Sequence, residues 1–290
     1  MIAAIVVAYF PEAAQLVSLL LKLSKQAQHV VVVDNTPEQF GTPSWLADLA
    51  TSNIQWIAQG ANVGIAEAHN IGIKAAQLSG AEQVILFDQD SQVGDDFILL
   101  LSSAAYKLRQ QGIKLACIGP RPFCIHANQQ SRPRVQRELQ RLADVTLVRQ
   151  IIASGMLIRV ADYKDIGPKE AGLFIDGVDH EWCWRAASKG YTVAICESVI
   201  MPHKLGDDRG RIIGISYKVG SPIRLYYQFR NTWVLARRSY VPTYWKLRNI
   251  VAQPVRFVLM GLFQSPRRLR IRYMLKGVLH GLLKKQGPYK

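Results

Sequence analysis

Hydrophobic residues occur along this chain as short continuous runs separated by amphipathic stretches. Residues 2–8 and 29–35 are apolar and rich in β-branched side chains, which predicts two buried strands. Between them, residues 12–25 carry apolar side chains at helical spacing, which predicts a helix. Continuous apolar strands joined by helices are typical of a parallel sheet that is covered on both faces. The amino-terminal part is therefore predicted to be an α/β domain.

The alternation of strands and helices continues through most of the chain. Residues 126–150 have weak periodicity, and no element is predicted for them. We expect further strands over 54–59, 83–90, 114–123 and 192–202, an interrupted strand over 151–160, and helices over 64–78, 97–110 and 178–189.

Polar residues follow several of the predicted strands. In parallel sheets, ligands bind beyond the carboxyl ends of the strands. We therefore expect Ala8-Tyr9, Asp34-Asn35 and Asp88-Gln89-Asp90 to share one rim. No GxGxxG sequence follows the first strand and no GxxxxGK[ST] sequence occurs, so neither a dinucleotide-binding fingerprint nor a P-loop is predicted.

The charge is distributed unevenly over the 290 residues, whose formal net charge is +15. Residues 1–203 contain 17 Lys and Arg against 19 Asp and Glu, whereas residues 204–290 contain 19 Lys and Arg against 2 Asp. The first part is thus nearly neutral at −2, and the tail carries +17. A basic, aromatic-rich tail suits an anionic membrane surface or a nucleic acid, or else forms a solvated helical face or a subunit interface.

Membrane spans and disulfide bonds are not expected. No stretch of 18 residues in the tail is free of charge, so residues 226–238 and 244–263 are predicted to lie in a membrane interface rather than cross it. The four cysteines form no CxxC pair and are expected to be reduced, mostly buried thiols. The amino terminus has no basic n-region and no cleavage pattern, which predicts a cytoplasmic protein.

Carboxylates gather at two places where a strand or loop gives way to another element. Asp88 and Asp90 follow an apolar strand and either bind one hard divalent cation or form a turn. Asp176, Asp179 and Glu181 precede or begin a predicted helix, where a carboxylate acts either as a cap or, beside tryptophans, as a general base. His203 follows a strand and is either a third metal ligand or a structural hydrogen bonder.

Several segments in a fixed order resemble the motifs of family-2 glycosyltransferases of the GT-A fold. Within that family, the sequences HKLG at 203–206 and YYQFRN at 226–231 look like those of rhamnosyltransferases that build bacterial surface polysaccharides of the O-antigen type. The resemblance rests on AYF at 8–10, VVDN at 32–35, Asn62, Gly64 and Asn70, FDQD at 87–90, ASGMLIR at 153–159 and DGVDHEWCWR at 176–185.

The resemblance implies a two-part organisation and a donor pocket. Residues 1–206 would form a GT-A domain with a Rossmann-like, mostly parallel sheet flanked by helices. Residues 207–290 would form a basic, mainly helical region that associates with a membrane or with another subunit. Asp34 would hydrogen-bond the nucleotide with Tyr9 beside the base, and Asn62 and Asn70 would lie in the same pocket.

The same resemblance assigns the remaining chemistry. Asp88 and Asp90 match the family's DxD motif, with Asp90 as a direct ligand of Mg²⁺ or Mn²⁺ and His203 as a further one. Gln89, the middle residue, is an unusual one for this motif. Asp179 falls at the position of the general base, with Asp176 as a competitor. The metal would neutralise a diphosphate leaving group, and a single displacement would invert the anomeric carbon.

The implied reaction moves L-rhamnose from dTDP-L-rhamnose to a lipid-linked saccharide at the cytoplasmic face of the membrane. Trp233, Tyr244 and Trp245 of the tail would then lie at the level of the lipid headgroups. One alternative keeps the enzyme class and changes the donor to a UDP-hexose. The other is a nucleic-acid or polyanion-binding protein, against which stands the lack of any known nucleic-acid motif.

Overall fold

A computed structural model describes residues 1–47, 49, 52–124, 129–130, 137–203, 209–212, 215–218 and 220–289. Two short strands, β11 (Arg209–Ile212) and β12 (Ile215–Lys218), pair with each other. The strands of the large sheet are β1 (Ile2–Ala8), β2 (His29–Pro37), β3 (Ile54–Gly60), β4 (Gln83–Asp88), β5 (Leu115–Cys124), β6 (Gln129–Gln130), β7 (Glu138–Leu142), β8 (Val145–Val148), β9 (Met156–Arg159) and β10 (Thr192–His203).

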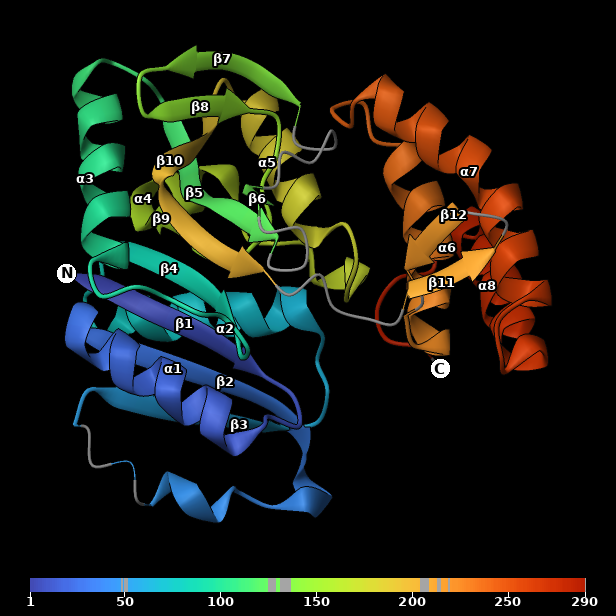
Figure 1. Ribbon diagram of the computed structural model, residues 1–290, viewed down its shortest axis with the longest axis horizontal. Helices are drawn as coiled ribbons and strands as arrows, with labels where there is room; N and C mark the ends of the chain where they lie inside the picture. Colours follow the sequence, from blue (N-terminus) through green and yellow to red (C-terminus); the bar gives the residue numbers. More distant parts are fainter. Residues whose placement is uncertain are drawn as a thin grey trace.

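An α-helix follows each of β1, β3, β4 and β9, and helices make up nearly all of the carboxyl-terminal part (Figure 1). Three short 3-10 helices are η1 (Glu38–Phe40), η2 (Ser44–Leu46) and η5 (Ala171–Leu173). The α-helices are α1 (Ala13–Gln26), α2 (Ile65–Leu78), α3 (Phe97–Gln110), α4 (Val160–Ile166), α5 (Val178–Ser188), α6 (Pro222–Ala236), α7 (Thr243–Leu262) and α8 (Arg267–Leu282).

The large sheet is parallel on one side and mixed on the other. Its strand order is β3-β2-β1-β4-β9-β5-β10-β8-β7, with β6 on β5. The strands from β3 to β4 pair in parallel, whereas β9 runs antiparallel to both of its neighbours, β4 and β5. The parallel half confirms the prediction from the apolar runs. Residues 138–148, for which no element was predicted, form the β7–β8 hairpin.

Two hydrophobic layers cover the sheet because alternate side chains of each strand point to opposite faces. In β1, Ile5 packs on the side of α2, α4 and α5, and Val6 packs on the side of α1 and α3. The strands β1, β2 and β4 are apolar on both faces and are therefore continuous hydrophobic runs in the sequence. This arrangement leaves the ends of the strands as the places where polar residues gather.

The carboxyl-terminal helices form a bundle that packs against the α/β domain. Leu225 and Phe229 of α6 meet Met260 of α7 and Met274 of α8 inside the bundle. Toward the α/β domain, Leu235 of α6 packs in one cluster with residues of α5 and of the segment before it. The basic tail is thus joined to the body by a hydrophobic interface. No helix in the described part of the chain has both the length and the apolar character that crossing a bilayer requires.

The aromatic residues of this bundle differ from the expectation of a headgroup belt. Trp245 is buried with its ring 5.1 Å from that of Trp184. The indole of Trp233 donates a hydrogen bond to Gln253, and the Tyr244 hydroxyl donates one to Gln150. The prediction that these side chains sit among lipid headgroups is wrong for Trp245, because it is part of the interface between the two parts of the protein.

Candidate active site

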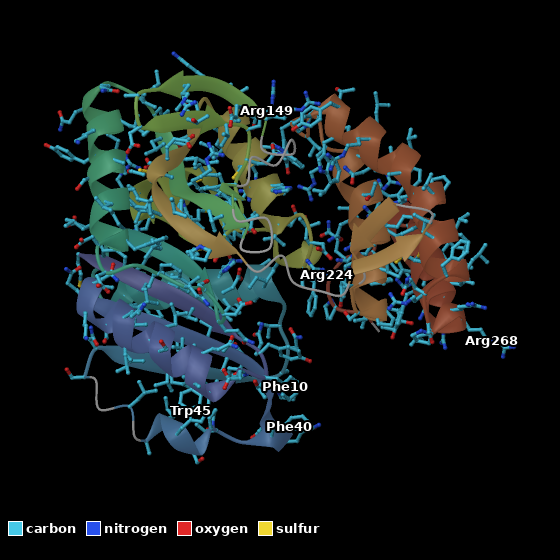
Figure 2. The ribbon with its side chains drawn as sticks, in the orientation of Figure 1. Phe10, Phe40, Trp45, Arg149, Arg224 and Arg268 are labelled. Carbon is cyan, nitrogen blue, oxygen red and sulfur yellow. The ribbon has the colours of Figure 1, made fainter. Side chains whose placement is uncertain are left out.

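An open cleft of about 1340 Å³ separates the carboxyl-terminal helices from the α/β domain. The α/β wall carries four carboxylates, and the opposite wall consists of residues from α6 and α7. Arg224 projects from the helical part toward the α/β domain (Figure 2). The carboxylates are Asp88, Asp90, Asp176 and Asp179. The two acidic segments singled out in the sequence, 90 residues apart, therefore meet in one place.

The end of β4 is fixed to the end of β1. The side-chain oxygen of Gln89 accepts a hydrogen bond of 2.7 Å from the backbone N–H of Tyr9. The N–H of Asp88 donates to the Ser91 hydroxyl, which in turn contacts Ser154. Gln89, the unusual middle residue of the motif, thus ties two strand ends together and leaves the carboxylates on either side of it in the cleft.

Asp88 lies where negative charge accumulates. Burial, followed by the nearby carboxylates of Asp179 and Asp90, raises the pKa of Asp88 to about 7. Lys169 and Arg224 offset this only in part. Crowded carboxylates of this kind fit a divalent cation, whose charge would relieve their repulsion.

The third ligand expected for that cation cannot be placed. His203 ends β10, where its backbone pairs with Cys124, but its side chain is outside the described part of the structure. Among the residues that are described, no three His, Cys, Asp or Glu side chains come together as a metal site. Of the three residues expected to bind a cation, Asp88 and Asp90 line the cleft.

Asp179 lies in the first turn of α5 and is held at both oxygens. Oδ1 accepts a hydrogen bond of 2.7 Å from Lys169 Nζ, and Oδ2 accepts one of 3.1 Å from the N–H of Ala153. Burial by itself would raise the pKa of Asp179, but Lys169 and His69 outweigh it and hold the pKa below its ordinary value. Asp179 is thus a fixed, ionised carboxylate in the cleft.

Asp176, the competing base, is engaged differently. The guanidinium of Arg224 binds both of its carboxylate oxygens at 2.9–3.1 Å. Its backbone is in the left-handed region with φ of 66°, and Gly177 follows with φ of 90°. The Asp176 carboxylate is therefore bridged to α6, whereas the negative charge of Asp179 helps to raise the pKa of Asp88 at the end of β4.

The loop before α5 is clamped from the carboxyl-terminal bundle. Arg230 and Asn231 of α6 are both buried and donate five hydrogen bonds of 2.8–3.0 Å to backbone carbonyls within residues 172–176. These are the last two residues of the YYQFRN sequence, which contributes to the family resemblance but had no predicted role in the site. The irregular backbone of the loop has its carbonyls satisfied in this way, so the position of Asp176 depends on α6.

The residues expected to bind the nucleotide lie at the ends of β1, β2 and β3. Asp34 is buried and accepts a hydrogen bond from the N–H of Thr36, and Asn62 accepts one from the N–H of Gly64. Tyr9 is 45% exposed, with its ring edge-on to Phe10, which in turn contacts Phe40 (Figure 2). Three of the four residues expected to bind the sugar-nucleotide donor thus lie along one edge of the sheet.

Asn70 has a different environment from the other three. Its side-chain oxygen accepts from the N–H of Lys169 and the hydroxyl of Tyr163, at 2.9 and 2.7 Å. Its amide nitrogen donates to the Lys169 carbonyl at 2.9 Å. Asn70 therefore holds the backbone of Lys169, a residue that the sequence analysis missed because an isolated lysine in a loop carries no motif.

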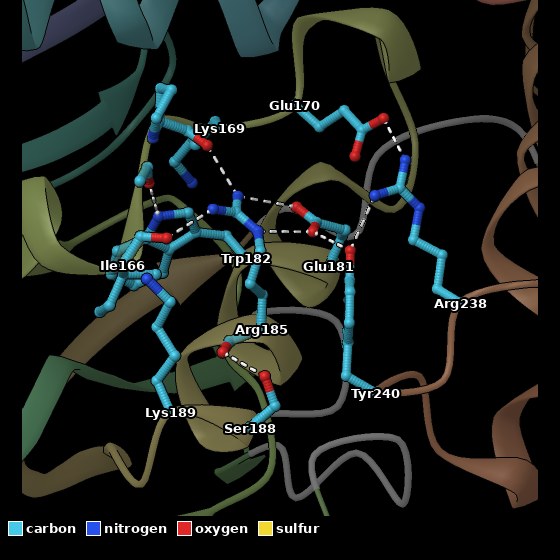
Figure 3. A network of polar contacts seen from close by, with 12 residues as sticks. Ile166, Lys169, Glu170, Glu181, Trp182, Arg185, Ser188, Lys189, Arg238 and Tyr240 are labelled. Carbon is cyan, nitrogen blue, oxygen red and sulfur yellow. Dashed lines mark hydrogen bonds and ion pairs between the residues drawn. The ribbon is translucent and has the colours of Figure 1, made fainter.

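Glu181 is a structural residue. Its carboxylate binds Arg185 one turn along α5 and accepts a hydrogen bond of 2.7 Å from the hydroxyl of Tyr240 (Figure 3). It is completely buried. Of the three carboxylates in this segment, only Asp176 and Asp179 line the cleft.

A mixed sheet with helices on both faces and carboxylates at the end of its fourth strand has the layout expected of the GT-A fold. The chain belongs to glycosyl transferase family 2, whose family model matches residues 4–167. It is 33% identical over 289 residues to the dTDP-rhamnosyl transferase RfbF of Shigella flexneri, an alignment covering 95% of this chain and 92% of that protein.

Solved structures share the fold at low sequence identity. S. aureus TarS 1-349 in complex with UDP-GlcNAc aligns over 97% of this chain and 81% of its own, with a TM-score of 0.59 and 14% identity. GalNAc-T7 with UDP, GalNAc and Mn²⁺ aligns with a TM-score of 0.60 and 14% identity, over 98% of this chain. This chain spans only 56% of the GalNAc-T7 chain.

Proposed function

We propose that this glycosyltransferase moves L-rhamnose from dTDP-L-rhamnose to a hydroxyl group of a lipid-linked saccharide. The observation that carries the proposal is the 33% identity, over nearly the whole chain, to a protein named a dTDP-rhamnosyl transferase. The convergence of Asp88, Asp90 and Asp179 in one cleft supports the chemistry. A UDP-hexose donor is the alternative, since one solved structure of the same fold is a complex with UDP-GlcNAc.

The nucleotide would bind along the edge formed by the ends of β1, β2 and β3. Asp34 would hydrogen-bond the nucleotide, Tyr9 would lie beside the base, and Asn62 would complete the pocket. The exposed ring of Tyr9 supports a stacking role. Asn70 would serve the site indirectly, by holding Lys169.

Asp88 and Asp90 would hold Mg²⁺ or Mn²⁺ together with the donor diphosphate, and His203 would be a further ligand. The cation would supply Lewis-acid stabilisation of the negative charge that develops on the diphosphate. The raised pKa of Asp88 supports this assignment, because burial and the nearby carboxylates of Asp179 and Asp90 both disfavour its negative charge, which a bound cation would stabilise.

Asp179 would act as the general base. It would accept the proton of the acceptor hydroxyl as that oxygen bonds to the anomeric carbon and the bond to the diphosphate breaks. One displacement from the opposite face inverts the configuration at that carbon. The ionised state of Asp179 supports the role, since only the carboxylate can accept a proton.

Thermal-shift measurements test the identity of the donor. The ligands are dTDP-L-rhamnose, dTDP, UDP-glucose, UDP-galactose and UDP, each with and without Mg²⁺ or Mn²⁺. A ligand that binds only the native state raises the melting temperature. At 100 times its Kd it adds about 2.7 kcal/mol of stability. We expect the largest rise with dTDP-L-rhamnose and metal. A larger rise with a UDP-hexose would show that the UDP-hexose is the donor. No rise with any nucleotide would contradict the proposal that the substrate is a nucleotide-sugar.

The acceptor would bind against α7, which forms the far wall of the cleft. This face of α7 combines apolar side chains with two guanidinium groups, those of Arg248 and Arg256. Leu247, Val251 and Val255 follow one another at intervals of four residues and are 60–70% exposed. Exposed apolar side chains at helical spacing beside cations suit an amphiphile with an anionic phosphate group. A saccharide carried on a lipid diphosphate has this chemistry.

Replacing Arg248 and Arg256 together by alanine tests this acceptor wall. A hydrogen bond to a charged group contributes about 1.5–3 kcal/mol, so the double variant is expected to raise KM for a lipid diphosphate-linked acceptor by tenfold or more. The melting-temperature rise with donor is expected to stay as in the wild type. The matched control, Arg267→Ala with Arg268→Ala, removes two exposed arginines from α8 and should leave KM unchanged. If donor binding were weakened and the acceptor KM unchanged, the two arginines would bind the donor and not the acceptor.

We further propose that the protein is cytoplasmic and peripheral on the inner face of the membrane. The +17 charge of residues 204–290 supports electrostatic binding to anionic lipid. The other role left for this region is an interface between copies of the chain.

A further inference from the structure

Lys169 is a lysine buried beneath the cleft. Its side chain is 0% exposed, and its Nζ lies 2.7 Å from Asp179 Oδ1. The sulfur of Met156 lies 4.0 Å from Nζ, and the centre of the Trp182 ring lies 5.9 Å from it. An ammonium group removed from water is costly unless it is paired. The Asp179 carboxylate is the group that compensates this cost.

The backbone around Lys169 is fixed from two helices, α2 and α5. Asn70 of α2 binds both the N–H and the C=O of Lys169. The indole of Trp182 donates to the Gly167 carbonyl, and Arg185 donates to the carbonyls of Ile166 and Pro168 (Figure 3). Every carbonyl from residue 166 to 169 thus has a donor from α2 or α5. This places Nζ at one defined position relative to Asp179.

The other basic side chains near Asp179 do not supply the positive charge that Lys169 supplies. His69 of α2 is completely buried, and burial, followed by Lys169, lowers its pKa to about 3, so its ring is neutral at pH 7. Burial also lowers the pKa of His180. Arg224 is bound to Asp176. The remaining charged groups that line the cleft are Asp88 and Asp90 at the end of β4 and Arg248 and Arg256 of α7.

We propose that Lys169 is a positioning residue that keeps Asp179 ionised and oriented toward the acceptor hydroxyl. The inference rests on the proposed role of Asp179 as the base. Each carboxylate oxygen offers two acceptor sites, so Oδ1 can bind Lys169 and Oδ2 can bind Ala153 while both keep a lone pair for the incoming proton. Lys169 itself touches neither substrate nor metal in this arrangement.

The Lys169→Met variant tests the inference through the pH dependence of kcat. In the wild type Lys169 holds the pKa of Asp179 low, and the base form exists above that pKa. Without Lys169, burial raises the pKa of Asp179. Because burial can raise a carboxyl pKa by several units, we expect the acid limb of the profile to move up by about two pH units. Activity that the variant lacks near pH 5 should then return toward pH 8.

A structural role for Lys169 would give a different result. Activity would fall by the same factor at every pH, with no shift of the acid limb, and that outcome would overturn the inference. Lys164→Met, which removes an exposed lysine from α4, is the matched control and should leave the profile unchanged. An unshifted limb combined with an inactive Asp179→Asn variant would reject the role of Lys169 alone, whereas a fully active Asp179→Asn variant would reject the base itself.

A measurement on the wild type covers the case in which Lys169→Met does not fold. The carboxyl ¹³C resonance of Asp179, assigned by its absence in Asp179→Asn, is followed from pH 8 downward. We expect it to stay at the ionised position past the ordinary aspartate value of about 3.9. A titration midpoint above that value would contradict the inference, because Lys169 would then not be holding the carboxylate ionised.

Discussion

Asp179→Asn is expected to lower kcat for sugar transfer by about 10²–10⁴-fold, the usual contribution of a general base. Asparagine keeps the shape of the side chain but has one oxygen, so it can accept a hydrogen bond from Lys169 or from the N–H of Ala153, but not both. It cannot take up the proton of the acceptor hydroxyl. The measurement is kcat with saturating donor and acceptor, together with the melting temperature to show that the variant is folded.

Two further substitutions make this result specific. Asp95→Asn changes an exposed carboxylate near α3 and should leave kcat unchanged. Asp176→Asn removes the competing base and its ion pair with Arg224. If Asp176→Asn abolished transfer while Asp179→Asn remained active, the two aspartates would exchange roles. The thermal-shift response to donor should survive in Asp179→Asn, because the role proposed for this side chain is to act on the acceptor.

Asp90→Ala is expected to abolish the dependence of transfer on Mg²⁺ or Mn²⁺ and to lower kcat/KM by about 10²–10⁴-fold. A metal acting as a Lewis acid contributes several kcal/mol to the transition state, and each 1.36 kcal/mol is tenfold in rate. Asp90 is exposed, so its loss should leave the fold intact. Activity is measured over a metal titration, and the melting temperature is measured with donor in the presence and absence of metal.

A control variant and a chelator experiment test the role of Asp90 further. Asp95→Ala removes a nearby exposed carboxylate and should keep both metal dependence and rate. The wild type treated with a chelator should fall to the level of Asp90→Ala. Unchanged metal dependence in Asp90→Ala would transfer the ligand role to Asp88 and His203, and full activity of the chelated wild type would rule out a catalytic cation.

Much of the α/β part follows from the sequence because its hydrophobic pattern is local. The strands at 2–8, 29–35, 54–59 and 83–90 were predicted from continuous apolar runs, and they pair in parallel. The rim residues Asp88 and Asp90 followed from their place after such a strand. The antiparallel insertion of β9 could not be predicted, since a short apolar run does not reveal the direction of its partner.

The tail shows what local patterns leave open. Its excess of arginine and aromatic residues predicted a region that faces a membrane or another subunit, but not which of these side chains stay at the surface. In the structure Arg230 is buried and hydrogen-bonds carbonyls of the loop before α5, and Trp245 packs against Trp184. Side chains of the same composition serve a buried interface or an exposed surface, and only the packing of the helices decides between them.

The sequence by itself determined the fold class, the family resemblance and the acidic residues that line the cleft, because these depend on periodicity and on motifs that are short and local. The tertiary structure alone decided how these carboxylates differ. Asp176 is bridged to Arg224, Asp88 is crowded by like charge, and Asp179 is held by a lysine from another loop. Burial and the distance between charges set these differences, and both arise only when segments distant in the sequence are brought together.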